Sequence, residues 1–529
     1  MNERVKENFF ERWGVALAMG AAAVLKVGFL LGEVVPFNAD EAIVALMARH
    51  ILQGTERPLF FYGQAYLGSL DAWLIAGGFA LFGQKVWVIR LVQLLLYLGT
   101  LWTTAKLGEK VFSRKVGVLA GWFLAIPTVN VTLYTTATLG GYGEALLIGN
   151  LVLWLALRLA DNGRIAKLLD WFLFGVLVGF GLWVFGLTLV FSAPAGLFLL
   201  WHGWRERGKR TLKPLLVAGA GFLLGAVPYW VGVFQLGGAR VAAELGGSAI
   251  AGVSGGGWLE QVGQHLISLV LLGTSVIFGV RPPWEVRWLA LPLIPFVLMF
   301  WGWVILRMFR MQKTPGQWLL LGVILTLVAG FVFTPFGADP SGRYFLPLAG
   351  PLSLFAAATV IGVKIPRVRW ALIGLVIVFH LIGTGQAARK NPPGITTQFD
   401  AVTWLDKSYD DDLIAFLREK GETRGYTNYW VAYPLAFLSQ EELIFVPELP
   451  YHLDFRHTRR DNRYAPYNAL VEQAERVAYI TTNHPPLNDR LRAGFADLGV
   501  SWEEEQIGNY QVFYNLSRPV RPVELDLSP

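Results

Sequence analysis

The stretch NADEAIVALMARHILQGTERPLFFYGQAYLGSLDAW, residues 38–73, is the first long polar interruption after a hydrophobic run. Two adjacent acidic residues, Asp40 and Glu41, open it, and the apolar residues that follow have helical spacing: Ile43, Leu46, Met47, Ile51 and Leu52. This pattern predicts an amphipathic helix that lies along a membrane surface. Gly54 predicts the end of this helix, and the aromatic-rich run 60–73 predicts a second interfacial helix.

The composition of the whole chain indicates a membrane protein. Of its 529 residues, 54% are hydrophobic and 16% are charged, and the mean hydropathy is +0.46. The chain has no cysteine, which excludes disulfides, thiolate metal sites and a cysteine nucleophile. Apolar runs long enough to cross about 30 Å of hydrocarbon recur as far as residue 388. We therefore predict a polytopic α-helical membrane module over residues 1–388 and a charged, water-soluble domain over residues 389–529.

The apolar runs predict about eleven transmembrane helices, near 13–35, 88–105, 116–130, 144–160, 170–184, 187–203, 214–234, 287–306, 316–336, 344–363 and 370–388. Lys and Arg cluster between alternate runs, at 4–12, 106–115, 158–167, 205–213, 307–313 and 364–369. Because basic residues accumulate in cytoplasmic loops, the N-terminus is predicted on the cytoplasmic side of the cell membrane and the C-terminal domain on the extracytoplasmic side. The net charge of +7 lies largely in these inner loops, so it is no evidence for nucleic-acid binding.

Two segments do not fit the pattern of long apolar runs separated by alternating inner and outer loops: one is rich in glycine and the other is apolar. The run 236–257 is rich in glycine and is predicted as a mobile outer loop. The apolar segment 258–286 has both flanks on the predicted outer side, which favours a re-entrant or interfacial helix.

Acidic residues in the first two outer loops allow two interpretations. As first-turn residues, Asp40 and Glu41 would complement the dipole of the predicted helix. As outer-face carboxylates, they could accept the proton of an attacking alcohol. Glu144 follows a glycine-rich turn at 140–143 and heads the fourth apolar run, so it is open to the same two interpretations.

The first loop resembles that of the GT-C superfamily of membrane glycosyltransferases, in particular the protein mannosyltransferase and lipid A aminoarabinose transferase family. Members carry an acidic pair after the first span, two juxtamembrane helices, a tryptophan, a Phe-Gly turn and an arginine that heads the next span. The matching residues here are Asp40-Glu41, Trp73, Phe82-Gly83 and Arg90. The order and spacing of the spans agree over residues 10–350.

The resemblance implies an inverting transfer of a sugar from a polyprenyl-phosphate donor to a hydroxyl or amine of a glycan, lipid or protein on the extracytoplasmic face. It implies Asp40 as the general base, Glu41 as a supporting group, and Glu144 as the second acidic position, where many members have Asp. A divalent cation at Asp40 and Glu144 stays an open alternative, because some family members work without metal. No other cofactor is expected.

A leaving lipid phosphate needs cationic or hydrogen-bonding partners on the same face. Candidates between the first two spans are Tyr62, Gln64, Lys85 and Arg90. The aminoarabinose transferases carry Lys-Pro-Pro where this chain has residues 64–68, so that lysine contact is missing here.

A further candidate for phosphate binding comes late in the chain, in GADPSGRYFLPLAGP at 337–351. Its Arg343-Tyr344 pair resembles the Arg-Tyr motif of the corresponding family span. The Arg343 guanidinium could bind a phosphate through two hydrogen bonds, or it could be an ordinary interfacial residue paired with Asp339.

Helical and strand-like pieces alternate from residue 410 onward, which predicts a small α/β domain with a partly parallel sheet. Within it, the basic and aromatic tract DFRHTRRDNRYAPY at 454–467 could bind an anionic glycan or lipid head group, or it could be a solvated loop.

Two other classes of function stay open. A transporter or lipid flippase with an appended outer domain would place functional charges near the middle of the membrane, where only Lys26 fits, and that lysine could equally be structural. A non-catalytic scaffold would not need acids that converge from two loops. A common outer cavity that receives Asp40, Glu144 and Arg343 would favour the enzyme.

Overall fold

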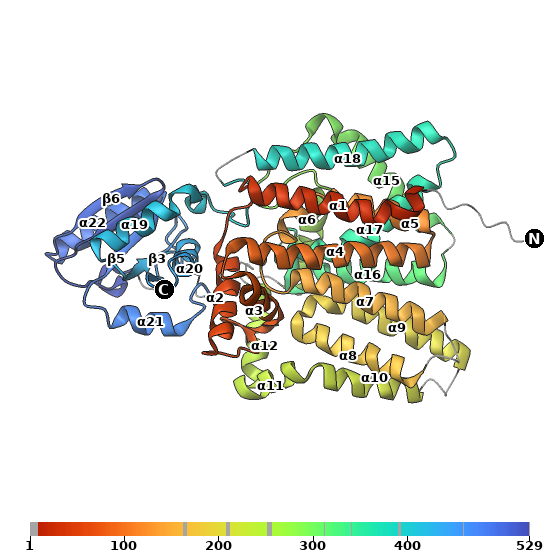
Figure 1. Cartoon of the computed structure of the whole chain (residues 1–529), viewed down its shortest axis with the longest axis horizontal. Helices are drawn as coiled ribbons and strands as arrows, with labels where there is room; N and C mark the ends of the chain where they lie inside the picture. Colours follow the sequence, from red (N-terminus) through yellow and green to blue (C-terminus); the bar gives the residue numbers. More distant parts are fainter. Residues whose placement is uncertain are drawn as a thin grey trace, which may run out of the picture. The chain divides into compact units, whose positions relative to one another are not determined.

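A computed structural model describes residues 9–161, 167–207, 212–250, 257–311, 313–339, 341–389, 393–458 and 460–527 (Figure 1). The chain forms two compact units. The helical unit comprises residues 1–32, 65–71 and 90–387, and the mixed unit comprises residues 33–64, 72–89 and 388–529. The mixed unit therefore joins most of the loop after the first apolar run, which is predicted to lie outside, to the C-terminal domain.

Long apolar helices make up the helical unit, and many of their axes run roughly parallel in Figure 1. In chain order the helices are α1 (Phe9–Leu31), α4 (Val86–Val111), α5 (Arg114–Ala125), α6 (Val129–Tyr134), α7 (Tyr142–Asp161), α8 (Leu168–Val184), α9 (Leu189–Arg207), α10 (Leu212–Gly225), α11 (Val227–Leu236), α12 (Gly238–Ile250), α13 (Trp258–Ser268), α14 (Thr274–Ile277), α15 (Ile294–Arg310), α16 (Pro315–Phe333), α17 (Ala349–Ile361) and α18 (Pro366–Ala388).

Within the described residues, eight helical stretches are long and apolar enough to cross a membrane, and the bent pair α10 and α11, which turns by 54°, makes a ninth. The predicted runs at 116–130 and 170–184 form helices α5 and α8, but these have only 12 and 17 residues. The polytopic α-helical architecture is confirmed, with two of the predicted spans shorter than expected. Parts of the basic clusters, at 4–8, 162–166, 208–211 and 312, lie outside the described residues.

Helices α8 and α10 pack through glycines. A Cβ atom at Gly175 would lie 1.9 Å from the Ala218 carbonyl oxygen, and one at Gly221 would lie 2.2 Å from the Phe172 carbonyl oxygen. Small residues that let backbones touch are the usual means of helix association in lipid. The short helix α8 is thus held by its neighbour.

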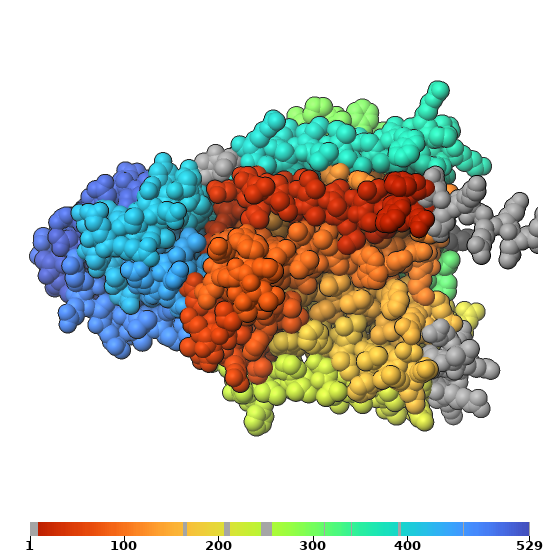
Figure 2. All heavy atoms as spheres, viewed as in Figure 1, coloured from red at the N-terminus to blue at the C-terminus, as the bar shows by residue number. Residues whose placement is uncertain are grey.

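Apolar side chains on the outer face of α1 are exposed, as expected for a helix that meets lipid. Val24 and Leu31 are 75% and 79% exposed, and the helix forms part of the face seen in Figure 2. Across the helix, Ala18 and Ala22 are buried against protein.

The loop predicted at 236–257 is largely wrong, because residues 238–250 form helix α12. Its sequence GARVAAEL places Arg240 and Glu244 one turn apart, where they form an ion pair at 3.0 Å, and Val241 is buried. Residues 251–256 lie outside the described part of the chain. In the segment 258–286, α13 is followed by a π-helical turn, Leu269–Gly273, and by the short α14.

The mixed unit contains a five-stranded sheet in the order β4-β3-β5-β7-β6. Strand β3 (Arg424–Thr427) pairs in parallel with β4 (Ile444–Pro447) and β5 (Ala478–Thr482), while β7 (Tyr510–Tyr514) pairs antiparallel with β5 and β6 (Glu503–Ile507). The helices of this domain are α19 (Asp410–Lys420), α20 (Tyr429–Leu438), α21 (Ala465–Glu472) and α22 (Pro485–Asp497). The predicted partly parallel α/β domain is confirmed.

Helix α2 (Ala39–Gln53) of the first outer loop belongs to the mixed unit and packs against α20. The Asn38 side chain caps its start by accepting a hydrogen bond from the Glu41 amide, and Gly54 ends it with a φ of 73°. The predicted helix and its end are confirmed. Residues 41–50 are buried, so its apolar residues pack on protein rather than lie on a membrane surface.

The second predicted interfacial helix begins later than expected. Residues 60–68 form two short strands, β1 (Phe60–Phe61) and β2 (Gln64–Gly68), and α3 (Leu70–Phe82) starts only after them. Gly63 turns the chain between the strands with a φ of 68°, and the aromatic residues beside it favour extended backbone.

Candidate active site

Asp40 lies in the first turn of α2, where it is half-buried. The Tyr429 hydroxyl, from the first turn of α20, donates a hydrogen bond to Asp40 Oδ1 at 2.6 Å. The helix start and this hydroxyl fix the direction of the carboxylate. The arrangement leaves Asp40 partly accessible to a ligand.

Glu41 points the other way. It is fully buried, and the Asn38 side-chain amide lies 3.4 Å from its Oε2. Asp40 is therefore the more accessible of the two carboxylates, and the roles of both residues stay predictions.

Charged residues of the C-terminal domain surround Tyr429. The Arg463 guanidinium lies over the Tyr429 ring, 5.7 Å from its centroid. With the Gln64 amide turned so that its oxygen faces this guanidinium, the oxygen accepts hydrogen bonds at 2.7 and 3.0 Å. Arg463 of the C-terminal domain therefore lies beside Gln64. Gln64 belongs to the segment 64–68, which lacks the lysine that the family resemblance leads one to expect.

Asp461 is the second carboxylate near this site. It is 9% exposed, and burial raises its pKa to about 7, with Arg463 opposing and Asp40 reinforcing the rise. Its charge state therefore changes near neutral pH.

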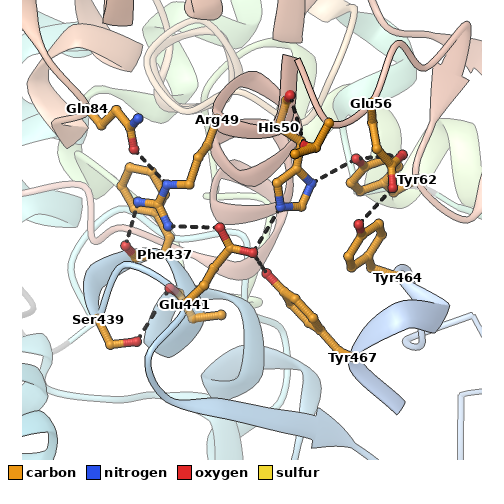
Figure 3. Close-up of polar contacts among 12 residues, drawn as sticks. Arg49, His50, Glu56, Tyr62, Gln84, Phe437, Ser439, Glu441, Tyr464 and Tyr467 are labelled. Atoms are coloured by element: carbon orange, nitrogen blue, oxygen red, sulfur yellow. Dashed lines mark hydrogen bonds and ion pairs between the residues drawn. The ribbon is translucent and has the colours of Figure 1, made fainter. Parts of the chain in front are cut away.

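A polar network holds α2 on the C-terminal domain (Figure 3). Glu441 lies 2.9 Å from His50 Nε2 and 3.5 Å from Arg49 Nη1, and it accepts a hydrogen bond from the Tyr467 hydroxyl at 2.7 Å. Burial alone would raise the pKa of Glu441, but the hydrogen bonds from His50 and Tyr467 and the Arg49 charge lower it. Arg49 also donates to the Phe437 carbonyl oxygen at 2.9 Å.

The same network contains Tyr62, one of the predicted donor-binding residues. Its hydroxyl lies 2.9 Å from His50 Nδ1 and donates to Glu56 at 3.1 Å, and Tyr464 donates to the same carboxylate at 2.7 Å. Figure 3 shows these side chains converging from α2, the first loop and the C-terminal domain. Tyr62 is thus engaged in holding the loop, and its predicted contact with the donor stays a prediction.

In the helical unit, Glu144 lies at the start of α7 and is 2% exposed. It is buried beside Asp71, which accepts hydrogen bonds from Gln93 at 2.9 Å and from Thr138. Two buried carboxyl groups therefore lie side by side in the helical unit. Asp71 was not singled out from the sequence, although an aspartate in the first turn of an apolar helix is a recognisable signal.

Arg343 forms an ion pair with Asp339 at 2.6 Å, and its guanidinium lies 5.0 Å from the centroid of the Tyr344 ring. Burial would raise the pKa of Asp339, but Arg343 and the hydrogen bonds from Ser341 lower it. The interfacial pairing predicted as one alternative is therefore present. Arg343 is about one-third exposed, so it also keeps a face toward solvent.

The other basic candidates differ in exposure. Lys85 is exposed and Arg90, at the head of α4, is buried. Lys26 is buried in α1, where its ammonium donates to Thr135 and Thr136 at 2.7 to 2.9 Å and lies 4.5 Å from the centre of the Tyr97 ring. These contacts give Lys26 a structural role, one of its two predicted alternatives.

The predicted site residues fall in both units. Asp40, Glu41, Tyr62, Gln64 and Lys85 belong to the mixed unit, and Arg90, Glu144, Arg343 and Tyr344 belong to the helical unit. Their convergence on one outer cavity stays a prediction. In the described part of the chain, no three His, Cys, Asp or Glu side chains gather as a metal ion would require.

Part of the chain matches the model of a known protein family. Residues 69–231 match the family model of dolichyl-phosphate-mannose-protein mannosyltransferases. Among curated proteins, no sequence matches the chain.

Two solved structures share the fold over nearly the whole chain. ArnT from Cupriavidus metallidurans bound to undecaprenyl phosphate is 12% identical, with 95% of this chain and 98% of that chain covered and a TM-score of 0.61. The oligosaccharyltransferase AglB from Archaeoglobus fulgidus, in complex with an inhibitory peptide and a dolichol-phosphate, is 14% identical. Its alignment covers 89% of this chain and 70% of that chain, with a TM-score of 0.52. The predicted resemblance is confirmed at the level of the fold: the chain shares the fold of ArnT and AglB, and its residues 69–231 match the model of dolichyl-phosphate-mannose-protein mannosyltransferases.

Proposed function

We propose that this membrane protein is an inverting glycosyltransferase that uses a polyprenyl-phosphate-linked sugar. An acceptor hydroxyl or amine attacks the anomeric carbon, and Asp40 takes the proton that the nucleophile loses. The new bond to the anomeric carbon forms as the bond from that carbon to the phosphate oxygen breaks. Polyprenyl phosphate leaves, and the configuration of the sugar inverts.

The observation that carries this proposal is the position of the Asp40 carboxylate, with its partial burial and its hydrogen bond. Asp40 is a half-buried carboxylate at a capped helix start, and the Tyr429 hydroxyl at 2.6 Å orients it, which supports its assignment as the general base. It stands on a chain whose fold is that of ArnT and AglB, and whose segment 69–231 matches a mannosyltransferase family.

Asp40→Asn tests the base directly. The amide keeps the shape of the side chain but cannot take the proton, so transfer from a polyprenyl-phosphate donor should fall by about 10²–10⁴. Asp489→Asn is the matched control, because that aspartate is 76% exposed and far along the chain. Transfer is measured with a panel of radiolabelled polyprenyl-phosphate sugars on cell membranes. Full activity of the folded Asp40→Asn protein would exclude Asp40 as the base.

The leaving phosphate needs cations on the face that holds Asp40. We propose Lys85, Arg90 and Arg343 for this role, with Tyr62, Gln64 and Tyr344 as hydrogen-bonding neighbours. Arg343 has the clearest support, because its ion pair with Asp339 holds the guanidinium in place and about one-third of the side-chain surface stays exposed. Glu144 is proposed as the second acidic group of the site. Transfer that continues unchanged after EDTA treatment would exclude the alternative in which Asp40 and Glu144 share a divalent cation.

A transporter or lipid flippase is the alternative class. The lysine that it would use in mid-membrane, Lys26, already donates hydrogen bonds to three oxygen atoms of Thr135 and Thr136, directly after α6. Sugar transfer by the purified protein in detergent, where there is no membrane to cross, separates the two classes.

A further inference from the structure

A polar pocket of about 60 Å³ lies in the C-terminal domain, between the end of β4 and the tract at 454–467, and it opens to solvent. Seven polar or aromatic residues line it: Glu448, Tyr451, Arg456, His457, Thr458, Asp461 and Asn462. Asp461 is buried, Glu448, Tyr451 and His457 are half-buried, and Arg456 and Asn462 are exposed. The pocket therefore has a buried acidic floor and an open, hydrophilic rim.

This pocket adjoins the Asp40 site within the same unit. Burial raises the pKa of both Tyr451 and Asp461, and the negative charge of Asp40 adds to the rise. The rings of Tyr429, Trp430 and Tyr451 follow one another with centroid separations of 5.2 and 6.4 Å. A chain of aromatic contacts thus leads from the hydroxyl that holds Asp40 to the pocket wall.

The chemistry of the lining suits a ligand rich in hydroxyl groups. Carboxyl groups accept hydrogen bonds, the Asn462 amide both donates and accepts, and the Tyr451 ring offers an apolar face. Burial lowers the pKa of His457, so its ring is neutral at pH 7 and supplies one donor and one acceptor.

We propose that this pocket binds a sugar unit of the acceptor glycan and so presents a neighbouring acceptor hydroxyl to Asp40. The assignment rests on the proposed glycosyl transfer and adds the class of acceptor, a carbohydrate. It also gives the tract 454–467 a role in binding glycan rather than in solvation alone.

The donor sugar fits this pocket less well. That sugar stays attached to a lipid phosphate, which needs fixed positive charge nearby. Arg456 is the only cation among the described residues that line the pocket, and it is exposed. The pocket has two acidic side chains, Glu448 and Asp461, and only this one arginine among its described residues, which favours an uncharged sugar over a phosphate.

Glycan binding is measured on the full-length protein in detergent, with the Asp40→Asn substitution, on an array of oligosaccharides without lipid. The Asp40→Asn substitution separates binding from turnover, because this protein is expected to lose sugar transfer and still bind the acceptor glycan. We expect at least one glycan to bind, and Asp461→Ala or Tyr451→Ala to weaken it tenfold or more. Asn462→Trp, which changes an exposed rim residue and fills the pocket, should do the same without disturbing the fold.

Asp489→Ala is the matched control and should bind as the parent does. Three results would overturn the proposal: no glycan binds, the pocket variants bind as tightly as the control, or peptides bind the pocket in place of glycans. Undecaprenyl phosphate is added in a parallel series, and displacement of the glycan by this lipid would assign the sugar to the donor instead. If Asp40→Asn stays active in transfer while the pocket variants lose glycan, the base assignment fails and the pocket assignment stands.

Discussion

Tyr429 connects two parts of the chain that are 389 positions apart. Its hydroxyl is the hydrogen-bond donor to the Asp40 carboxylate, and its ring packs under the Arg463 guanidinium. An aspartate alone has free rotation about its side-chain bonds, whereas a donor at 2.6 Å selects one orientation. Tyr429 is therefore a positioning residue for the proposed base.

Tyr429→Phe should lower kcat about tenfold while leaving KM for the lipid donor unchanged. The estimate follows from the net value of a hydrogen bond to a charged group, about 1.5–3 kcal/mol, of which part is expressed in the transition state. Tyr409→Phe, which changes a 38% exposed tyrosine of the same domain, is the control. A rise in KM with unchanged kcat would show instead that Tyr429 acts in binding.

Asp461 predicts a dependence of stability on pH. Its pKa of about 7 in the folded protein exceeds the ordinary value of 3.8, so the folded state holds a proton that the unfolded state has already released. Its contribution to stability is therefore largest below pH 4, falls as pH rises toward 7, and stays low above that. The groups that face it are Arg463, Asp40 and Tyr451.

Melting temperatures of the parent protein and of Asp461→Asn, measured from pH 4.5 to pH 8, check this expectation. The asparagine cannot ionise, so the melting temperature of the variant should rise relative to that of the parent protein as the pH increases. A constant difference across that range would mean that Asp461 stays ionised throughout.

Helix α2 depends on the C-terminal domain for its position. Glu441 receives contacts from His50, Arg49 and Tyr467, and Arg49 is only 3% exposed. Removing the charge of Glu441 would leave a buried guanidinium with a weaker partner.

Glu441→Gln should destabilise the mixed unit by about 1–3 kcal/mol, the usual cost of losing a charged hydrogen-bond partner. The neighbouring Glu442 pairs with Arg418 but is 50% exposed, so Glu442→Gln is a control with the same chemistry and should change little. Limited proteolysis of both variants, followed at sites in residues 54–59, compares the two. Equal cleavage rates would show that the network does not hold α2.

The elements of this fold were predictable where local sequence determines them. The apolar runs located the membrane helices, and Gly54 located the end of α2, because length, hydropathy and left-handed backbone are properties of a few adjacent residues. The strands at 60–68 were missed, since an aromatic run next to glycine fits both an interfacial helix and a hairpin.

The site was predictable only in part. Asp40 and Glu144 stood out because they are acids in outer loops of an apolar chain. Asp461 and Arg463 stood out only as members of the tract 454–467, and Tyr429 did not stand out at all, because nothing near it in the sequence indicates that α20 meets α2. Contacts between residues this distant in the sequence follow from the packing of the whole unit, which a single sequence does not reveal.

At the scale of the whole molecule, the absence of cysteine makes the predicted topology directly testable. Asp489→Cys places a thiol on an exposed site of the C-terminal domain, and Lys106→Cys and Lys364→Cys place thiols in two predicted inner loops. A maleimide that cannot cross the membrane should label only the first in intact cells. Labelling of the inner-loop variants before the cells are opened would reverse the orientation.

The contact between α2 and α20 also sets an order of events during synthesis. Asp40 is translated 389 residues before Tyr429, and at 5–20 residues per second this interval lasts roughly 20 to 80 s. Throughout that time the acidic loop has left the ribosome, while the helix that orients its carboxylate does not yet exist. A nascent chain released early would carry Asp40 without its hydroxyl partner, so the proposed base is oriented only when the chain is nearly complete.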